Sequence, residues 1–258
     1  MGCSSCKPQS DISPEEKILQ SFEKSLGVHK LQLLTIDRVL HRYSSETGMS
    51  TSQFERAVSE LSLNSTDFQA FYSCFYEKYQ YNMKKLNCLG ILLSEDQAQK
   101  KLKILFQSYD SDTSGNLSGE ELAKMINDLT EVACVIIPKG AWKLNLGNEK
   151  FKLYVKQIGS VRKSLVRQFV GSITEGKESI NEREFNLSYQ RDDGVRNILS
   201  TRAMREYCYY MKTHLIGSVD DIMLRLVSVD QDHVFDMLSG KSGKKRKSRK
   251  NKTLKVKE

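Results

Sequence analysis

Apolar residues recur at helical spacing along most of this 258-residue chain. Positions i, i+3, i+4 and i+7 lie on one face of an α-helix, so a stripe at this spacing predicts a helix with one buried side. Two such stripes flank a short polar segment: Leu102, Leu105, Phe106 and Tyr109 before it, and Leu122, Met125, Ile126 and Leu129 after it. Because the chain also has only three prolines, the pattern predicts an all-α protein.

Similar spacing predicts further helices near Pro14, from Val28 to Tyr43, from Trp142 to about Phe169, and from Ser200 onward. Ser200 is placed to cap the last of these helices. The predicted apolar face of this last helix consists of Met204, Tyr207, Cys208 and Met211.

Residues 66–93 carry a stripe that predicts buried helices and no loop. The stripe consists of Phe68, Phe71, Tyr72, Phe75, Tyr79, Met83, Leu86, Leu89 and Leu92. Ser94 and Gln97 then predict a capping box for the next helix. Residues 138–140, Pro-Lys-Gly, predict a turn.

The polar segment between the first two stripes carries the clearest chemistry. Residues 110–121 form a twelve-residue frame with oxygen-bearing side chains at positions 1, 3, 5, 9 and 12, the spacing that wraps a chain around Ca²⁺. The predicted ligands are Asp110, Asp112, Ser114, Asn116 through its backbone carbonyl, Ser118 through a water, and Glu121 through both carboxylate oxygens. Gly115 stands at position 6, where the chain must turn sharply.

Helix, loop and helix together resemble the EF-hand calcium-binding superfamily, with an intact hand at about residues 97–130. The resemblance implies helix-loop-helix pairs in a two-lobed arrangement like that of calmodulin or recoverin, with a short β-bridge between paired loops. The alternative interpretation is an acidic surface turn between two amphipathic helices.

Two other segments fit the frame only in part. Between Tyr43 and Phe54 the loop is two residues shorter and has one carboxylate, so a degenerate hand and a plain helical hairpin both fit. Residues 173–184 fit the length, but Ile173 and Lys177 occupy ligand positions, so this hand, at about 165–195, is predicted not to bind. Leu117 and Ile180, both at position 8, are predicted to face each other across paired strands.

These assignments predict five segments. They are an acylated arm and linker (1–27), a degenerate N-terminal lobe (28–98), a C-terminal lobe (99–199), C-terminal helices (200–238) and a disordered polybasic tail (239–258). The helices of 200–238 either complete the core or include one that lies in the groove of a lobe until a partner displaces it.

The net charge of +8 belongs to the tail. Residues 241–258 hold ten Lys or Arg and one acidic residue, which leaves a net charge of −1 for residues 1–240. Nucleic-acid binding by the folded part is therefore disfavoured. Six irregularly spaced cysteines argue against a disulfide scaffold, and the sequence shows no secretory signal and no membrane-spanning run.

The N-terminus fits a lipid anchor. Gly2 follows the initiator Met as in N-myristoylated proteins, and the run with Cys3 and Cys6 resembles the dually acylated starts of some Src-family kinases. One myristoyl chain anchors weakly, so palmitoylation of the cysteines would add the second anchor. Incidental cysteines on a frayed terminus are the alternative.

The basic tail offers a further membrane contact through Lys244, Lys245, Arg246, Lys247, Arg249 and Lys250. These residues are predicted to bind anionic lipid, each contributing about 1 kcal/mol near such a surface. A nuclear-import or nucleic-acid arm and a solubility tail are the alternatives.

The sequence predicts a binding protein and not an enzyme, because it has no nucleophile elbow, P-loop or kinase signature, and no small-molecule substrate is expected. One working hand with an acylated start resembles neuronal calcium sensors and calcineurin B-like subunits. This implies a calcium sensor on the cytoplasmic face of a plasma or ciliary membrane that binds a target protein in an apolar groove. A scaffold in a cytoskeletal or ciliary assembly is the alternative function, and the nucleus the alternative location.

Overall fold

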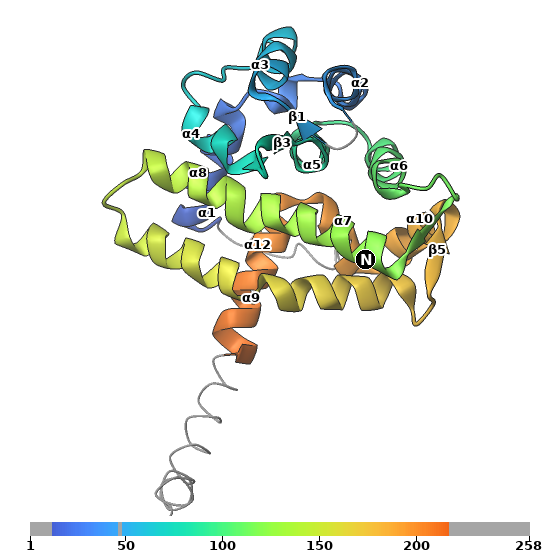
Figure 1. Cartoon of the computed structure of the whole chain (residues 1–258). Coiled ribbons are helices and arrows are strands. Elements are labelled where there is room, and N and C mark those ends of the chain that lie inside the picture. The colour runs from blue at the N-terminus through green and yellow to red at the C-terminus, as the bar shows by residue number, and fades with distance from the viewer. Residues whose placement is uncertain (1–11, 46–47, 217–258) are drawn as a thin grey trace, which may run out of the picture. The chain divides into compact units, whose positions relative to one another are not determined.

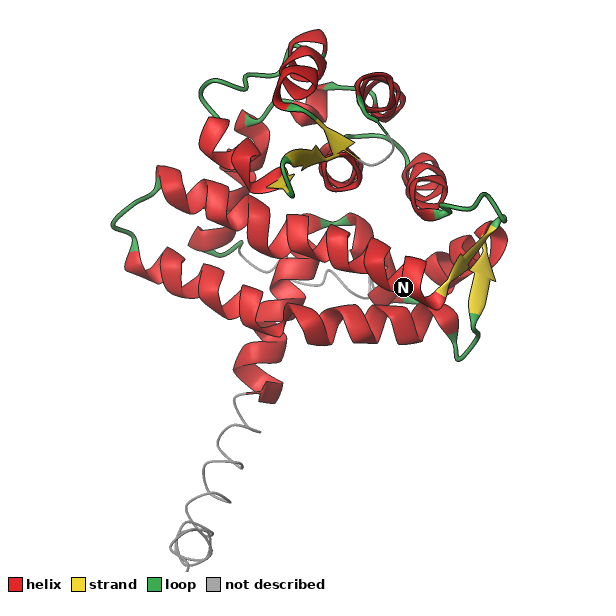
Figure 2. Ribbon diagram, viewed as in Figure 1, coloured by secondary structure: helices red, strands yellow, loops and turns green. Residues whose placement is uncertain are grey.

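The structure, a computed structural model, describes residues 12–45 and 48–216 (Figure 1). Helices account for most of these residues, and the strands form two small sheets (Figure 2). The mostly helical fold predicted from the apolar stripes is confirmed.

Apart from the 26-residue α9, the helices and strands are short. The α-helices are α1 (Pro14–Ser25), α2 (Leu33–Tyr43), α3 (Thr51–Glu60), α4 (Gln69–Tyr72), α5 (Met83–Leu93), α6 (Ala98–Tyr109), α7 (Gly119–Glu131), α8 (Ile137–Leu144), α9 (Glu149–Thr174), α10 (Glu182–Arg191), α11 (Asp193–Arg196) and α12 (Thr201–Tyr210). The strands are β1 (Gly48–Met49), β2 (Tyr76–Glu77), β3 (Gln80–Asn82), β4 (Asn116–Ser118) and β5 (Ser179–Asn181). Single 3₁₀ turns are η1 (Val28–Lys30), η2 (Ser73–Phe75) and η4 (Asn197–Leu199), and π-helical turns are η3 (Val132–Ile136) and η5 (Met211–Ile216).

Polar residues begin several of these helices. Ser200 accepts a hydrogen bond from the backbone N–H of Ala203 at 3.2 Å, so the predicted cap of α12 is confirmed. The predicted capping box of Ser94 and Gln97 is wrong. The apolar run of α5 extends to Ser94, whose N–H donates to the carbonyl of Gly90, and Gln97 makes no side-chain cap.

Residues 66–93 contain a hairpin that the sequence did not predict. Strands β2 and β3 pair with each other, and β3 also pairs with β1, with Met49 opposite Tyr81. Strands of two or three residues are too short to show the alternation that marks a strand in a sequence. Of the aromatic stripe, Phe71, Tyr72 and Phe75 are buried as predicted, but Tyr79 is 89% exposed at the hairpin turn.

Both central residues of this turn have a left-handed backbone. The φ angle is 48° at Lys78 and 70° at Tyr79. Two-residue hairpin turns of this kind favour Asn followed by Gly, because a left-handed conformation costs most residues with a Cβ roughly 1–2 kcal/mol.

We expect Lys78→Asn/Tyr79→Gly to raise the free energy of unfolding by about 1 kcal/mol, because the turn loses strain and the exposed Tyr79 side chain gives up little burial. Denaturant unfolding of the full chain measures the change. Lys78→Ala/Tyr79→Ala is the control, since it keeps a Cβ at both positions and should not stabilise. Equal stabilisation by both variants would contradict the backbone explanation.

The chain does not turn at residues 138–140, so that prediction is wrong. Helices α7, η3 and α8 follow one another without a break from Gly119 to Leu144. Pro138 lies in the first turn of α8, where a missing N–H is tolerated, and the π-helical turn before it already interrupts the regular hydrogen-bond ladder. A Cβ on Gly140 would lie 2.6 Å from the ring of Phe71, so glycine here allows α8 to approach that ring closely.

The core of the C-terminal half surrounds α7. The predicted apolar face is confirmed, since Leu122, Met125, Ile126 and Leu129 have no exposed surface. Helix α7 packs against α9, and α12 packs against both α9 and η3 (Figure 1). On the predicted face of α12, Met204 and Cys208 are fully buried and Tyr207 is half-buried.

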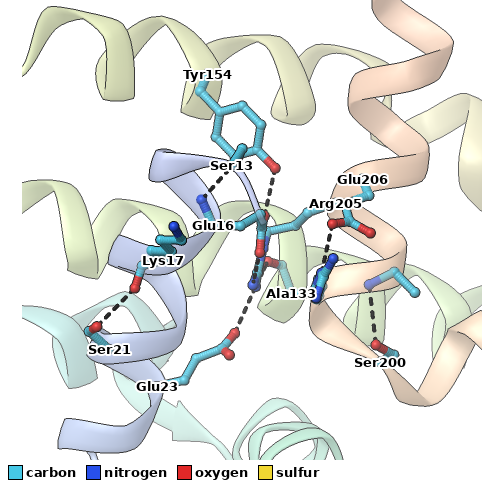
Figure 3. A network of polar contacts seen from close by, with 12 residues as sticks. Ser13, Glu16, Lys17, Ser21, Glu23, Ala133, Tyr154, Ser200, Arg205 and Glu206 are labelled. Atoms are coloured by element: carbon cyan, nitrogen blue, oxygen red, sulfur yellow. Dashed lines mark hydrogen bonds and ion pairs between the residues drawn. The ribbon is translucent and has the colours of Figure 1, made fainter. Parts of the chain in front are cut away.

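A cluster of charged side chains is enclosed among these helices (Figure 3). The guanidinium of Arg205 on α12 has no exposed surface and donates to both carboxylate oxygens of Glu16 on α1, at 2.9 and 2.8 Å. Arg205 also donates to Glu23 at 2.7 Å and to the carbonyl of Ala133 in η3 at 3.3 Å. The hydroxyl of Tyr154 on α9 donates to Glu16 at 2.6 Å, so four elements meet at this cluster.

We expect Arg205→Met to lower the free energy of unfolding by about 3–5 kcal/mol, because it leaves Glu16 charged and buried without its partner. Adding Glu16→Gln should restore part of the loss, since the amide removes the charge and still accepts from Tyr154. Arg202→Met on the same helix is the control, because its pair with Glu206 is partly exposed and should contribute less than about 1 kcal/mol. Denaturant unfolding measures all three, and a similar loss for Arg202→Met and Arg205→Met would contradict this account.

Candidate metal-binding loop

The predicted loop connects α6 to α7. Helix α6 ends at Tyr109, Asp110 follows as its C-terminal cap, and β4 leads into α7. The hydroxyl of Ser118 accepts from the N–H of Glu121 at 3.3 Å, while the Glu121 carboxylate accepts from the N–H of Ser118 at 3.0 Å. This capping box fixes the residues at positions 9 and 12 of the frame relative to each other.

Backbone N–H groups hold the first two carboxylates. Asp110 accepts from the N–H groups of Ser114 and Gly115 at 3.0 Å each, and Asp112 accepts from the N–H of Ser114 at 3.0 Å. The hydroxyl of Ser114 donates to the carbonyl of Asn116 at 3.0 Å. Hydrogen bonds within the loop therefore link the residues at positions 1, 3, 5 and 7 of the frame.

Glu121 closes the frame from its far end. Its Oε1 accepts from the N–H of Ser111, ten residues earlier, at 3.1 Å. Its Oε2 accepts from the N–H and the hydroxyl of Ser118 at 3.0 Å each. Both oxygens of the predicted bidentate ligand thus engage the loop.

These hydrogen bonds favour ionised carboxylates. The hydroxyl and N–H of Ser114 hold the pKa of Asp112 below its usual value. Partial burial raises the pKa of Glu121, but the N–H groups of Ser118 and Ser111 lower it by more, so the net shift is downward. A carboxylate must be ionised to bind a metal ion, so both groups are ready to do so at neutral pH.

Gly115 provides the predicted sharp turn, with φ at 76°. A Cβ at this position would meet nothing within 4 Å, so the backbone conformation, not crowding, favours glycine. Thr113 also has a positive φ, at 53°, which adds to the curvature of the loop.

A second loop pairs with this one. Strands β4 and β5 are antiparallel, and Leu117 lies opposite Ile180, the pair that the sequence predicted to face each other. In the second loop the ammonium of Lys177 donates to Oε1 of Glu184 at 2.6 Å. The ammonium of Lys177 therefore pairs with the carboxylate at position 12 of this loop, which a metal ion would need as a ligand.

A set of polar side chains behind the first loop was not predicted from the sequence. The hydroxyl of Tyr109 donates to Asp128 on α7 at 2.8 Å. The ammonium of Lys84 on α5 lies 4.9 Å from the centre of the Tyr109 ring and donates to the hydroxyl of Ser111 at 3.0 Å. Asp128 lies beside an apolar stripe and Lys84 lies in the first turn of α5, so neither disturbs the helical pattern.

The other predicted sites are not described. Gly2, Cys3 and Cys6 lie outside the described residues, as do the basic residues Lys244, Lys245, Arg246, Lys247, Arg249 and Lys250. Among residues 12–45 and 48–216, no three His, Cys, Asp or Glu side chains are grouped as a metal site. The predicted ligand set includes a hydroxyl, a carbonyl and a water-bridging serine beside its three carboxylates, and it stays a prediction.

Comparison of the sequence with models of known protein families and with curated proteins found no match. None of the helices in the described part combines the length and apolar character needed to span a bilayer. The residues and geometry of the loop are therefore the features that indicate a function.

Proposed function

We propose that residues 110–121 bind one Ca²⁺ ion and that the chain is a calcium-binding protein of the EF-hand type. The observation that supports this best is the closure of Glu121 onto Ser111 and Ser118, at the far end of a loop that already gathers Asp110 and Asp112. Oxygen donors of this kind suit a hard cation such as Ca²⁺.

The proposed ligands are those expected from the frame. Asp110, Asp112 and Ser114 would bind through side chains, Asn116 through its carbonyl, Ser118 through a water and Glu121 through both oxygens. Three carboxylates on one divalent ion suggest an affinity in the sensor range, roughly 10⁻⁷ to 10⁻⁵ M. Because Lys177 occupies the paired loop, one ion binds per chain, with little cooperativity.

The proposed role is that of a calcium sensor or regulatory subunit, a binding protein and not an enzyme. Binding would draw Glu121, and with it the start of α7, toward Asp110. Phe106, Leu122, Met125 and Ile126 are at most 2% exposed, so a change in the angle between α6 and α7 would uncover apolar surface for a target helix.

The same burial supports a second function, that of a scaffold in which Ca²⁺ only stabilises the fold. Helix α7 packs against α9 and α5, and the hydrogen bond from Tyr109 to Asp128 links it to α6. If these contacts persist on calcium binding, the fold gains stability without exposing a groove.

Calcium titration of Glu121→Gln tests the ion site. An amide lacks the charge and the bidentate geometry of the carboxylate, so we expect the calcium affinity to fall by at least about 100-fold, since even groups that only support a ligand contribute 10- to 100-fold. Calorimetry on the full chain measures the affinity. Glu120→Gln is the matched control, because it makes the same charge change one residue away on the exposed side and should bind as wild type does.

Two outcomes would contradict the calcium assignment: unchanged affinity in Glu121→Gln, or no binding by the wild-type chain. An apolar dye then separates the two roles. A sensor increases the dye fluorescence when calcium is added, whereas a scaffold only raises the melting temperature.

The proposed location is the cytoplasmic face of a membrane, with Gly2, Cys3 and Cys6 acylated and the basic tail on anionic lipid. We expect Gly2→Ala to shift most of the protein to the soluble fraction, because the myristoyl chain requires an N-terminal glycine. Fractionation of cells that express the chain with a C-terminal tag measures this, and Ser4→Ala is the control. Gly2→Ala that remains on membranes would show that acylation is not the anchor.

A further inference from the structure

A polar cavity of about 350 Å³ lies beside the candidate loop. It is bounded by the β2–β3 hairpin, the start of α5 and the middle of α7. Its charged lining residues are Glu77, Lys78, Lys84, Lys85, Lys124 and Asp128. Four of these six carry a positive charge.

Both acidic residues of the lining already have partners. Glu77 pairs with the ammonium of Lys85, which also contacts Glu131 at 3.1 Å. Asp128 accepts the hydroxyl of Tyr109 at 2.8 Å, on its core side. Lys85 is therefore the paired lysine, and the other three outnumber Asp128, whose hydrogen bond to a neutral hydroxyl leaves its own charge in place.

Lys84 is the most unusual of the three, because it is only 8% exposed and its direct contacts are neutral. Its ammonium donates to the Ser111 hydroxyl at 3.0 Å and lies above the Tyr109 ring. No carboxylate of the described residues lies within ion-pair distance of Lys84, Lys78 or Lys124. Burial lowers the pKa of Lys84, and the nearby charge of Lys124 lowers it further, although Glu121 and Asp128 act in the opposite direction.

A buried ammonium with no carboxylate in direct contact is unfavourable, so an anion bound in this cavity would stabilise Lys84. We propose that the cavity binds the phosphate group of a phosphate ester. A phosphate carries up to two negative charges on several acceptor oxygens, which suits Lys84 and Lys124 together, and lysine is a common point-charge ligand for phosphate. The volume is at the lower end of small-molecule sites and leaves room for part of the esterified group.

The same phosphate chemistry is found in soluble metabolites and in lipid headgroups. Glycerol 3-phosphate is the soluble probe, and vesicles of phosphatidylcholine with phosphatidic acid present the same phosphate monoester on a membrane. Phosphatidylserine vesicles provide the baseline, because their phosphate is a diester and they report the binding of the basic tail to anionic lipid.

The experiment measures binding of the full chain to each probe with calcium chelated, so that it does not depend on the calcium proposal. We expect Lys84→Met/Lys124→Met to weaken binding by at least about tenfold, because two charge-assisted contacts are lost. Lys103→Met/Lys156→Met is the matched control, since it removes the same charge from exposed positions outside the cavity and should bind as wild type does.

The pattern of losses identifies the source of the phosphate. A selective loss for glycerol 3-phosphate supports a soluble ligand, and a selective loss only on phosphatidic acid vesicles supports a lipid headgroup. Equal affinities of the two double variants for every probe, or no wild-type binding above the phosphatidylserine baseline, would overturn the proposal. If the double variant does not fold, the single variant Lys124→Met, at an exposed position of α7, is compared with Lys103→Met. Weaker binding by Lys124→Met supports the proposal, and equal binding by the two overturns it.

Discussion

The buried pairing of Arg205 with Glu16 holds together segments from the two ends of the described chain. The partners are 189 residues apart in sequence, and neither is more than 1% exposed. Burying two charges is favourable only when nearly all their hydrogen-bonding capacity is used, and here Glu23, Tyr154 and a carbonyl of η3 complete the set. Because η3 continues directly from α7, the cluster also fixes the far end of the helix whose first turn carries Glu121. The candidate loop is thus built on an anchored helix.

The two paired loops differ at ligand positions 1 and 5, where the second loop has Ile173 and Lys177. Ser114 offers its hydroxyl and N–H to neighbouring oxygens, whereas Lys177 places an ammonium on Glu184. The first loop leaves its carboxylates for an external cation, whereas in the second loop Lys177 itself provides the cation. The strand pairing of Leu117 with Ile180 is the same for either state, so the second loop can serve the fold without a metal.

The parts of the fold that the sequence predicted are those in which a local pattern has one structural outcome. The stripe from Leu122 to Leu129 and the facing pair of Leu117 and Ile180 belong to this kind. The hairpin at residues 76–82 was missed because its strands are too short to alternate. The turn assigned to Pro138 was wrong because a π-helical turn before it accommodates the proline. Lys84 and Asp128 were not predicted because their contacts come from segments distant in sequence.

The candidate loop and the polar cavity are linked through one side chain. Lys84 lines the cavity and also donates to Ser111, whose N–H holds Glu121. A cation in the loop would neutralise carboxylates that now offset the charge of Lys84, which strengthens the positive field in the cavity. An anion in the cavity would in turn reduce the repulsion between Lys84 and an incoming cation. Binding free energies couple reciprocally, so the two proposed ligands favour each other, and the coupling is strongest at low ionic strength, where such charges are least screened.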